Sequence, residues 1–398
     1  MRQERYSRND EGGFHAGTRH EQEGAGARHR AQAIATLRTV LQSIRVAAYR
    51  IPTDAPESDG TLEWDSTTLV VVHAAAGGTR GIGYTYADRS TAALIQDRLA
   101  PLLEGREALE VGARWNDMVR AIRNLGRPGI GSMAISAVDS ALWDLKGRIM
   151  GAPLATLLGR CRDAIPVYGS GGFTSYTVER LCEQLGGWAG AGMKFVKMKV
   201  GRAPSADADR VAAARRAIGN SAALFVDANG AYTRKQALAQ AEAFARCGVA
   251  WFEEPVSSDD LEGLRLLRDR APPGMAISAG EYGYDLPYFR RMLQAQAVDV
   301  LQADATRCGG VTGFMAAAAL CEAHGLPLSS HCAPALHLPL MCAARAAVHA
   351  EYFHDHARIE EKLFDGVPRP HDGFLAPDRD RPGFGFELKE KDAECYSV

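Results

Sequence analysis

Three carboxylates in the middle of the sequence, Asp227, Glu253 and Glu281, each stand at or just after the end of a short apolar run. They are separated by 26 and 28 residues, which is close to the roughly 30 residues of one strand–helix repeat in a barrel of parallel strands. Carboxylates at equal depth on neighbouring strands repel one another unless a cation lies between them. Because oxygen ligands favour Mg²⁺ or Mn²⁺ over zinc, the spacing predicts a metal site with one Mg²⁺ per subunit.

Two lysines end the apolar run that precedes these carboxylates, in the order Lys197-Met198-Lys199. Side chains two positions apart share one side of a strand, so both ammonium groups are expected to face the same space. A lysine beside a bound cation and a second lysine has a lowered pKa, and its neutral amine is then a usable base. The pair therefore predicts a general base, with two solvated surface lysines as the alternative.

A histidine and an aspartate form a second pair further along the chain. His331 follows a late apolar run, and Asp304 stands 27 residues earlier, on the expected neighbouring strand. A carboxylate on one imidazole nitrogen fixes the tautomer and raises the basicity of the ring, which leaves the other nitrogen free to move a proton. The pair is therefore a candidate acid/base, and Glu351 falls within the eighth and last apolar run.

The elements that must position these residues alternate between short apolar strands and Ala-rich amphipathic helices, a rhythm typical of parallel sheets. The eight expected strands are residues 165–168, 195–200, 224–226, 250–252, 276–279, 298–302, 327–330 and 350–353. Eight such units favour closure into a barrel of the α/β class, in which functional groups lie where strands end. A doubly wound sheet is the alternative, but its G-x-G-x-x-G phosphate fingerprint is absent.

The segment before the barrel has a different pattern. Strands are expected near residues 44–49, 67–73 and up to 83–84, followed by helices over 91–99, 108–123 and 132–150. This pattern predicts a compact α+β module. Loops of the module are expected over 52–65 and over 83–89.

The chain accordingly divides into four predicted parts. Residues 1–40 are polar and rich in Arg, Glu, Gly and His, which predicts a disordered N-terminal extension. Residues 41–160 form the α+β module, residues 161–370 the barrel, and residues 371–398 a C-terminal segment.

Taken together, the motifs resemble those of the enolase superfamily, specifically its mandelate racemase-like subgroup. The resemblance covers residues 41–391 and rests on Lys197-Met198-Lys199, Val226-Asp227-Ala228-Asn229, Trp251-Phe252-Glu253-Glu254-Pro255, Gly280-Glu281, Asp304 followed by Gly309-Gly310-Val311-Thr312-Gly313, and Ser330-His331. It implies a modified TIM barrel, (β/α)7β, with an α+β capping domain built from both ends of the chain.

The resemblance also implies roles for the residues at the strand ends. The three spaced carboxylates are expected to bind Mg²⁺, with Lys199 as the base on one face of the substrate and the His331–Asp304 pair on the other. Lys197 and a protonated Glu351 resemble the groups that polarise a substrate carboxylate and stabilise the enolate that develops from it.

Four further residues are expected to contact the substrate. Asn229 resembles an additional contact to substrate or to the metal shell. Trp64, Tyr84 and Tyr86 lie on the two expected cap loops, where the resemblance places substrate specificity. These polar and aromatic groups suit a polyol better than an aromatic hydroxy acid.

The resemblance leaves two reactions open. Removal of the proton α to a carboxylate gives an enediolate, and loss of a β-hydroxyl from it gives a 2-keto-3-deoxy acid. The favoured function is therefore a Mg-dependent dehydratase of sugar acids, aldonates or aldarates. A racemase or epimerase of a 2-hydroxy acid is the alternative, and a non-catalytic binding protein is disfavoured because every expected position is occupied.

Composition sets the remaining expectations. A formal net charge of −2 gives no global field to attract nucleic acid or an anionic membrane. No run approaches the about 18 apolar residues of a membrane span. Eight scattered cysteines without a C-x-x-C pair favour reduced thiols in a cytoplasmic enzyme. The resemblance adds the expectation of a homo-oligomer.

Overall fold

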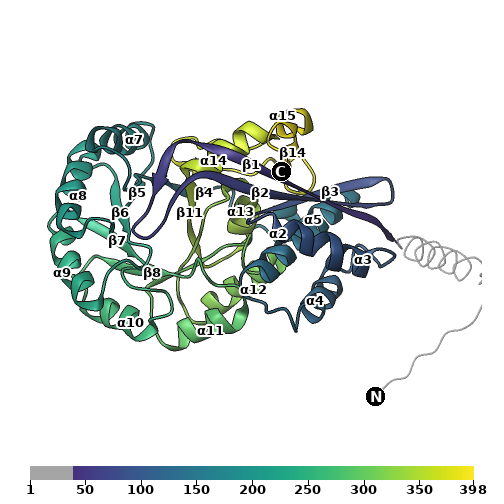
Figure 1. Ribbon diagram of the computed structural model, residues 1–398, viewed down its shortest axis with the longest axis horizontal. Helices are drawn as coiled ribbons and strands as arrows, with labels where there is room; N and C mark the ends of the chain where they lie inside the picture. The colour runs from purple at the N-terminus through teal and green to yellow at the C-terminus, as the bar shows by residue number, and fades with distance from the viewer. Residues whose placement is uncertain (1–38) are drawn as a thin grey trace, which may run out of the picture. The chain divides into compact units, whose positions relative to one another are not determined.

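In a computed structural model that describes residues 39–398, the chain opens with three antiparallel strands. These are β1 (Leu41–Ser58), β2 (Glu63–Ala76) and β3 (Thr79–Tyr86), in the sheet order β1-β2-β3 (Figure 1). The predicted disordered extension, residues 1–40, lies outside the described residues apart from its last two.

The hairpin of β1 and β2 is longer than the sequence predicts. The expected loop over 52–65 is wrong, because only the turn over 59–62 separates the two strands. A register shift after Pro52 accommodates the proline. The barrel holds the tip of the hairpin, since the amide of Thr174 donates to the carbonyl of Ser58 at 2.8 Å and its hydroxyl donates to the carbonyl of Asp59 at 2.7 Å. Tertiary contacts, and not local propensity, therefore extend these strands.

Helices cover one face of this sheet. They are α2 (Ser90–Leu94), the π-helical turn η1 (Ile95–Leu99), α3 (Ala100–Leu103), α4 (Val111–Ala121) and α5 (Ile130–Ile149). Helix α5 packs directly on β3 because two glycines leave its surface bare: a Cβ on Gly83 would lie 2.4 Å from the carbonyl oxygen of Ala137, and one on Gly81 would meet Ala141 at 2.5 Å. The sheet and its helices form the α+β capping domain.

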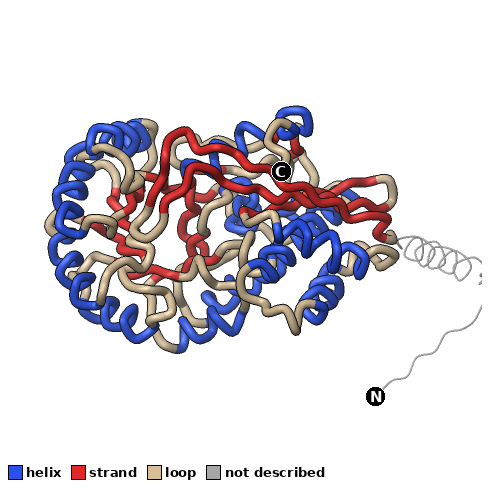
Figure 2. The backbone as a smooth tube through the Cα atoms, in the orientation of Figure 1, coloured by secondary structure: helices blue, strands red, loops and turns tan. Residues whose placement is uncertain are grey.

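The second part of the fold is a closed barrel of eight parallel strands (Figure 2). The strands are β4 (Ile165–Gly171), β5 (Phe195–Lys199), β6 (Ala223–Asp227), β7 (Val249–Glu253), β8 (Ala276–Ala279), β9 (Val300–Ala303), β10 (Leu328–Ser330) and β11 (Ala347–Phe353). The barrel closes because β11 pairs with β4 as well as with β10. Closure excludes the doubly wound alternative.

Helices connect the successive strands on the outside of the barrel. They are α7 (Val178–Gly190), α8 (Pro204–Ile218), α9 (Arg234–Ala245), α10 (Leu261–Arg270), α11 (Leu286–Gln294), α12 (Gly310–Ala323) and α13 (Pro334–Ala343). Seven connecting helices between eight strands, in the part of the chain that the structure describes, confirm the predicted (β/α)7β barrel with its α+β cap.

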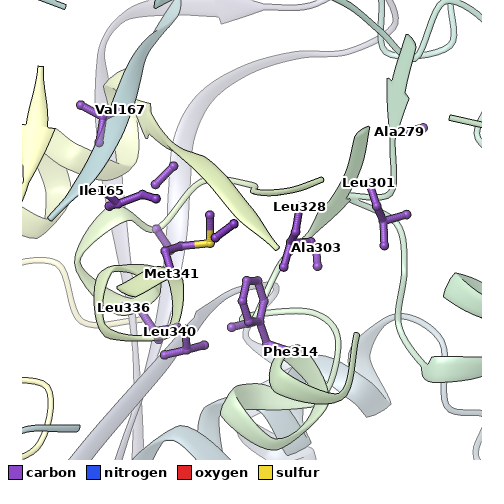
Figure 3. Packing of buried hydrophobic residues seen from close by; sticks show 14 of the residues in the cluster. Ile165, Val167, Ala279, Leu301, Ala303, Phe314, Leu328, Leu336, Leu340 and Met341 are labelled. Atoms are coloured by element: carbon purple, nitrogen blue, oxygen red, sulfur yellow. The ribbon is translucent and has the colours of Figure 1, made fainter. Parts of the chain in front are cut away.

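The apolar core of the barrel lies between its strands and these helices. Figure 3 shows Leu301 and Leu328 of the strands together with Phe314 of α12 and Leu340 and Met341 of α13, and all five side chains are buried. Outward positions along each strand thus serve packing, which leaves the alternate, inward positions for other purposes.

The C-terminal residues run back to the capping domain. After α14 (His354–Leu363), β12 (Phe364–Asp365), β13 (Phe374–Leu375), β14 (Glu387–Leu388) and α15 (Glu390–Glu394), the last residues pair with β1. The amide of Arg50 donates to the carbonyl of Tyr396 at 2.8 Å, and the amide of Val398 donates to that of Ala48 at 3.1 Å. Among residues 39–398, no helix has the length and apolar character needed to cross a membrane.

Candidate active site

The interior of the barrel has two layers built from alternate residues of the same strands. The lower layer is aromatic: Tyr168, Phe195, Phe225, Trp251 and His349 contact one another there. Two positions further along four of these strands, the inward residues are charged, namely Lys197, Asp227, Glu253 and Glu351. Because side chains two positions apart share one side of a strand, these charged groups all lie nearer the same end of the barrel.

Strand register brings the three carboxylates together. Asp227 pairs with Glu253 across β6 and β7, and Glu281 follows β8 after Gly280. Only glycine suits that turn, because its φ is +139° and a Cβ would lie 2.1 Å from the carbonyl oxygen of Gln302.

The residues present fit a hard divalent cation. Asp227, Glu253 and Glu281 each offer an oxygen within 4.8 Å of the others, and all three are buried. Oxygen Oε2 of Glu281 has no hydrogen-bond partner among the described residues. Three converging carboxylates with one uncommitted oxygen form a candidate Mg²⁺ site of the oxygen-ligand type.

Both lysines lie against this cluster. Lys197 Nζ is 2.7 Å from Glu253 Oε1 and 2.8 Å from Glu351 Oε1, and Lys199 Nζ is 2.5 Å from Asp227 Oδ2. Burial alone would lower the pKa of each ammonium, but the surrounding carboxylates raise the pKa of both lysines above the ordinary value. The fall in pKa that the sequence predicts requires a cation to offset those carboxylates.

The predicted acid/base pair is assembled just beyond the ends of β9 and β10. His331 Nδ1 lies 2.8 Å from Asp304 Oδ2, and Asp304 Oδ1 accepts hydrogen bonds from the amide and the hydroxyl of Thr306, both at 2.7 Å. Burial would raise the pKa of Asp304, but its bond to His331 and the charge of that ring hold it below the ordinary value. The other ring nitrogen, Nε2, is 3.4 Å from Glu281 Oε2, so it faces the carboxylate cluster.

Glu351 differs from the expectation in its charge. The sequence predicts a protonated carboxyl, and burial alone would favour that form. The Lys197 ammonium instead holds the pKa of Glu351 below its ordinary value, and the amide of Cys332 donates to Oε2 at 2.7 Å. Two donors to the charged form explain why this carboxylate stays ionised.

Sequence reasoning missed one cation of the site, Arg307. Its Nη1 lies 3.3 Å from Glu281 Oε1, and its Nε lies 3.6 Å from Asp304 Oδ2. The guanidinium therefore joins a metal-ligand candidate to the acid/base pair. Its position three residues after Asp304, where the chain leaves β9, is the signal that could have identified it.

A cavity of about 430 Å³ lies between these barrel residues and the capping domain. Asn229, Trp64 and Tyr86 all line it, as the sequence predicts for substrate contacts. The indole of Trp64 donates to Glu57 Oε2 at 2.8 Å, and the ring of Tyr86 stacks on His356 at 3.4 Å. Both aromatic side chains are therefore held in place by neighbours.

Tyr84 is not part of this cavity. It lies within β3, where the sequence predicts a loop, because the strand continues to Tyr86. Its side chain is fully buried, and its hydroxyl donates to Glu360 Oε1 at 2.6 Å. Tyr84 thus joins the cap to the barrel, and we do not retain it as a substrate contact.

Comparison with protein families agrees with this architecture. Residues 44–159 match the N-terminal domain model of the mandelate racemase / muconate lactonizing enzymes, and residues 178–393 match the enolase C-terminal domain-like model. The chain belongs to this family. The two matched regions correspond to the capping domain and to most of the barrel, and the resemblance to the enolase superfamily is confirmed.

Two curated members of the family illustrate its range. The chain is 34% identical to a 3,6-anhydro-α-L-galactonate cycloisomerase of Streptomyces coelicolor, over 88% of this chain and 97% of that protein. It is 31% identical to an L-talarate/galactarate dehydratase of Salmonella typhimurium, over 79% of this chain and 78% of that protein. Relatives in the family therefore include acid-sugar dehydratases and cycloisomerases.

Solved structures of the family superpose closely. A mandelate racemase/muconate lactonizing enzyme-like protein from Rubrobacter xylanophilus has a TM-score of 0.89 and 57% identity, covering 90% of this chain and all of that one (100%). A racemase from Streptomyces coelicolor with bound magnesium has a TM-score of 0.85 and 31% identity, covering 90% of this chain and 100% of that one. Magnesium is thus bound in a structure of the family.

Proposed function

We propose that this protein is a Mg-dependent lyase that dehydrates a sugar acid to a 2-keto-3-deoxy acid. The observation that carries the proposal is the placement of two proton-transfer groups, Lys199 on β5 and the His331–Asp304 pair just beyond β9 and β10, around the cluster of three carboxylates. Similarity to acid-sugar dehydratases supports the reaction class.

The first step is removal of the proton at C2 by Nζ of Lys199 in its amine form. The electron pair of the broken C–H bond becomes part of an enediolate whose charge lies on the carboxylate oxygens. A Mg²⁺ ion held by Asp227, Glu253 and Glu281 would supply Lewis-acid stabilisation of that charge. Lys197, which lies between Glu253 and Glu351, would donate a hydrogen bond to the same oxygens.

The second step returns the electron pair and breaks the C3–O bond. The pair forms the C2–C3 double bond of an enol, and Nε2 of His331 gives its proton to the departing oxygen, which leaves as water. Asp304 holds the ring by its Nδ1 and stabilises the charged imidazolium before that transfer. The enol then gains a proton at C3 and becomes the 2-keto-3-deoxy acid.

A second candidate uses the same elimination with a different leaving group. If the oxygen on C3 belongs to an anhydro ring, breaking the C3–O bond opens the ring and releases no water, which makes the reaction an isomerisation. Similarity to a 3,6-anhydro-galactonate cycloisomerase over nearly the whole of both chains favours this candidate. Racemisation, in which His331 returns the proton to C2, remains the third reading of the same residues.

The three reactions are separated by one screen of aldonates, aldarates and 3,6-anhydro-aldonates in D₂O with added Mg²⁺. Semicarbazide detects the 2-keto acid, and mass spectrometry tells whether water is lost. Apart from the deuterium that both reactions place at C3, a dehydratase gives a keto acid lighter than the substrate by one water, and a cycloisomerase gives a keto acid of otherwise unchanged composition. Deuterium at C2 without any keto acid would contradict the proposal in favour of a racemase.

Two further expectations stay with the proposal. The substrate is a small sugar acid, and neither nucleic acid nor membrane is expected as a partner. A cytoplasmic homo-oligomer stays a prediction, and all eight cysteines carry free thiols in the described structure.

A further inference from the structure

The cavity above the carboxylates has two walls that differ in their charged groups. The barrel wall carries the cations Lys199 and Arg307 and the ring of His331, beside the carboxylates Glu281 and Glu351. The cap wall consists of residues from the tip of the β1–β2 hairpin, from β2 and from the end of β3. Within the described residues, the cap wall contains no lysine, arginine or histidine, whereas two carboxylates, Asp59 and Asp88, line it.

We propose that the substrate carries a single carboxylate, bound at the barrel wall, and presents an uncharged hydroxylated end to the cap. This makes it an aldonate-type monoacid and not an aldarate. The inference rests on the proposed function, because it assumes that the α-carboxylate binds beside Lys197 and the carboxylate cluster.

Both cap carboxylates are fixed by local hydrogen bonds and not by cations. Oδ1 of Asp59 accepts the amide of Thr61 at 2.6 Å and that of Leu62 at 2.7 Å. Oδ1 of Asp88 accepts the amide and the hydroxyl of Ser90 at 2.8 and 2.7 Å, and these bonds lower the pKa of Asp88. A second substrate carboxylate would therefore meet like charge at this wall.

The cations of the barrel wall are already engaged. Lys199 is paired with Asp227, and Arg307 lies between Glu281 and Asp304. Between the two walls lies His356, whose ring stacks on a cap tyrosine; burial and the nearby His331 hold its pKa well below the ordinary value, so it stays neutral. No described group is left to balance a second carboxylate.

The polar groups of the cap wall instead suit hydroxyls. Oδ2 of Asp59 has no hydrogen-bond partner among the described residues and can accept a hydrogen bond from a substrate hydroxyl. Thr68 contributes a further hydroxyl to the same wall, and the ring of Trp64 offers an apolar face for the C–H side of a sugar chain. A site with buried hydrogen-bonding groups discriminates strongly against a partner that leaves them unpaired.

The test compares pairs of acids that differ only at the far end, such as galactonate with galactarate and gluconate with glucarate, in the Mg²⁺-loaded enzyme. Formation of 2-keto acid and exchange of the C2 proton in D₂O are both measured across the aldonates, aldarates and 3,6-anhydro-galactonate. We expect a preference for the monoacid of roughly 10²-fold or more in kcat/KM. An equal or greater kcat/KM for the aldarate overturns the inference but leaves the proposed function intact. Absence of both keto acid and exchange with every acid overturns the two together.

A pair of variants tests the cause of the preference. Thr68→Lys adds a cation to the cap wall, and Thr68→Gln is the neutral control of similar length. The lysine variant is expected to raise the aldarate-to-aldonate ratio of kcat/KM by about 10-fold or more relative to the glutamine variant. Thermal unfolding of both verifies that they fold. Equal ratios in two folded variants would show that cap charge does not set the preference.

Discussion

The two layers of the barrel interior lie two residues apart along the same strands and have different roles. Phe195, Phe225 and Trp251 of the lower layer pack against one another, with the rings of Phe225 and Trp251 stacked at 5.2 Å. Two residues further along the same strands stand Lys197, Asp227 and Glu253, whose charged side chains are buried. The lower layer stabilises the barrel, whereas burial of the charged upper layer costs folding free energy.

That contrast explains why the charged layer can exist. A buried charge costs several kcal/mol unless it is paired, and in the upper layer Lys197 pairs with Glu253 at 2.7 Å and with Glu351 at 2.8 Å. Glu253 shows the tension: burial and Asp227 raise its pKa to about 8 even though Lys197 lies 2.7 Å away. Strands anchored by aromatic packing below can carry such groups at their ends. Changes in the upper layer should therefore affect catalysis, and changes in the lower layer should affect stability.

The largest expected effect comes from the metal. Treatment with EDTA should abolish activity, and added Mg²⁺ should restore it, because the three carboxylates otherwise repel the charge that develops on the substrate. Mg²⁺ should also raise the thermal midpoint of the wild type, since a ligand that binds only the folded state stabilises it. Glu281→Gln should lose that thermal response, whereas the same change at exposed Glu262 should keep it. Full activity in EDTA would contradict the assignment.

Removal of the base should have the next largest effect. Lys199→Met should lower kcat by roughly 10²- to 10⁴-fold, the usual contribution of a general base, and should abolish exchange of the C2 proton in D₂O. Lys235→Met makes the same change on the exposed surface of α9 and should leave turnover unaltered. Exchange that persists in Lys199→Met would assign the base to another group.

The charged residues at the strand ends were largely predictable from the sequence, and the cap wall was not. Asp227, Glu253 and Glu281 were identifiable because a strand repeat of constant length and a period of two leave little freedom in where a strand-end side chain points. Arg307 was missed because it lies beyond the strand end, where no period applies. The loop over 52–65 and the position of Tyr84 were misjudged because contacts with the barrel, such as that between Ser58 and Thr174, extend strands that local propensity does not favour.

Protonation states also depended on the assembled structure. The sequence predicts a neutral Glu351, and general principles allow it, since burial favours the uncharged acid. The ammonium of Lys197 at 2.8 Å reverses that outcome. No linear pattern encodes which charges converge from different strands at such distances.

The lower layer should respond in stability and not in chemistry. Phe225→Ala removes a ring that contacts four others, and it should lower the free energy of unfolding by about 3–5 kcal/mol, as aromatic-to-alanine changes in cores do. Urea unfolding measures this loss, and kcat per folded molecule should change only a few-fold. Phe374→Ala, at a partly exposed site, is the control and should cost far less. A much larger loss of kcat per folded molecule, without the expected loss in the free energy of unfolding, would show that the two layers do not have separate roles.

The smallest effect tests the imidazole ring of the lower layer. His349 lies among Tyr168, Phe225 and Trp251, and burial lowers its pKa to about 4 from 6.5. The unfolded chain therefore binds the proton first, so stability is full above pH 6.5 and is lost as the pH falls toward 4. A shift of this size corresponds to about 3 kcal/mol.

His349→Gln removes that titration while keeping a polar partner for the hydroxyl of Ser329, which lies 3.0 Å from Nδ1. Urea midpoints measured between pH 6.5 and 4 should fall less steeply in this variant than in the wild type. The same substitution at exposed His324 should leave the wild-type slope unchanged. An unaltered slope in His349→Gln would mean that the ring accepts a proton among the aromatic side chains without cost. The lower layer would then tolerate charge as the upper layer does. The two layers would differ only in which side chains they contain, and not in how much a buried charge costs in them.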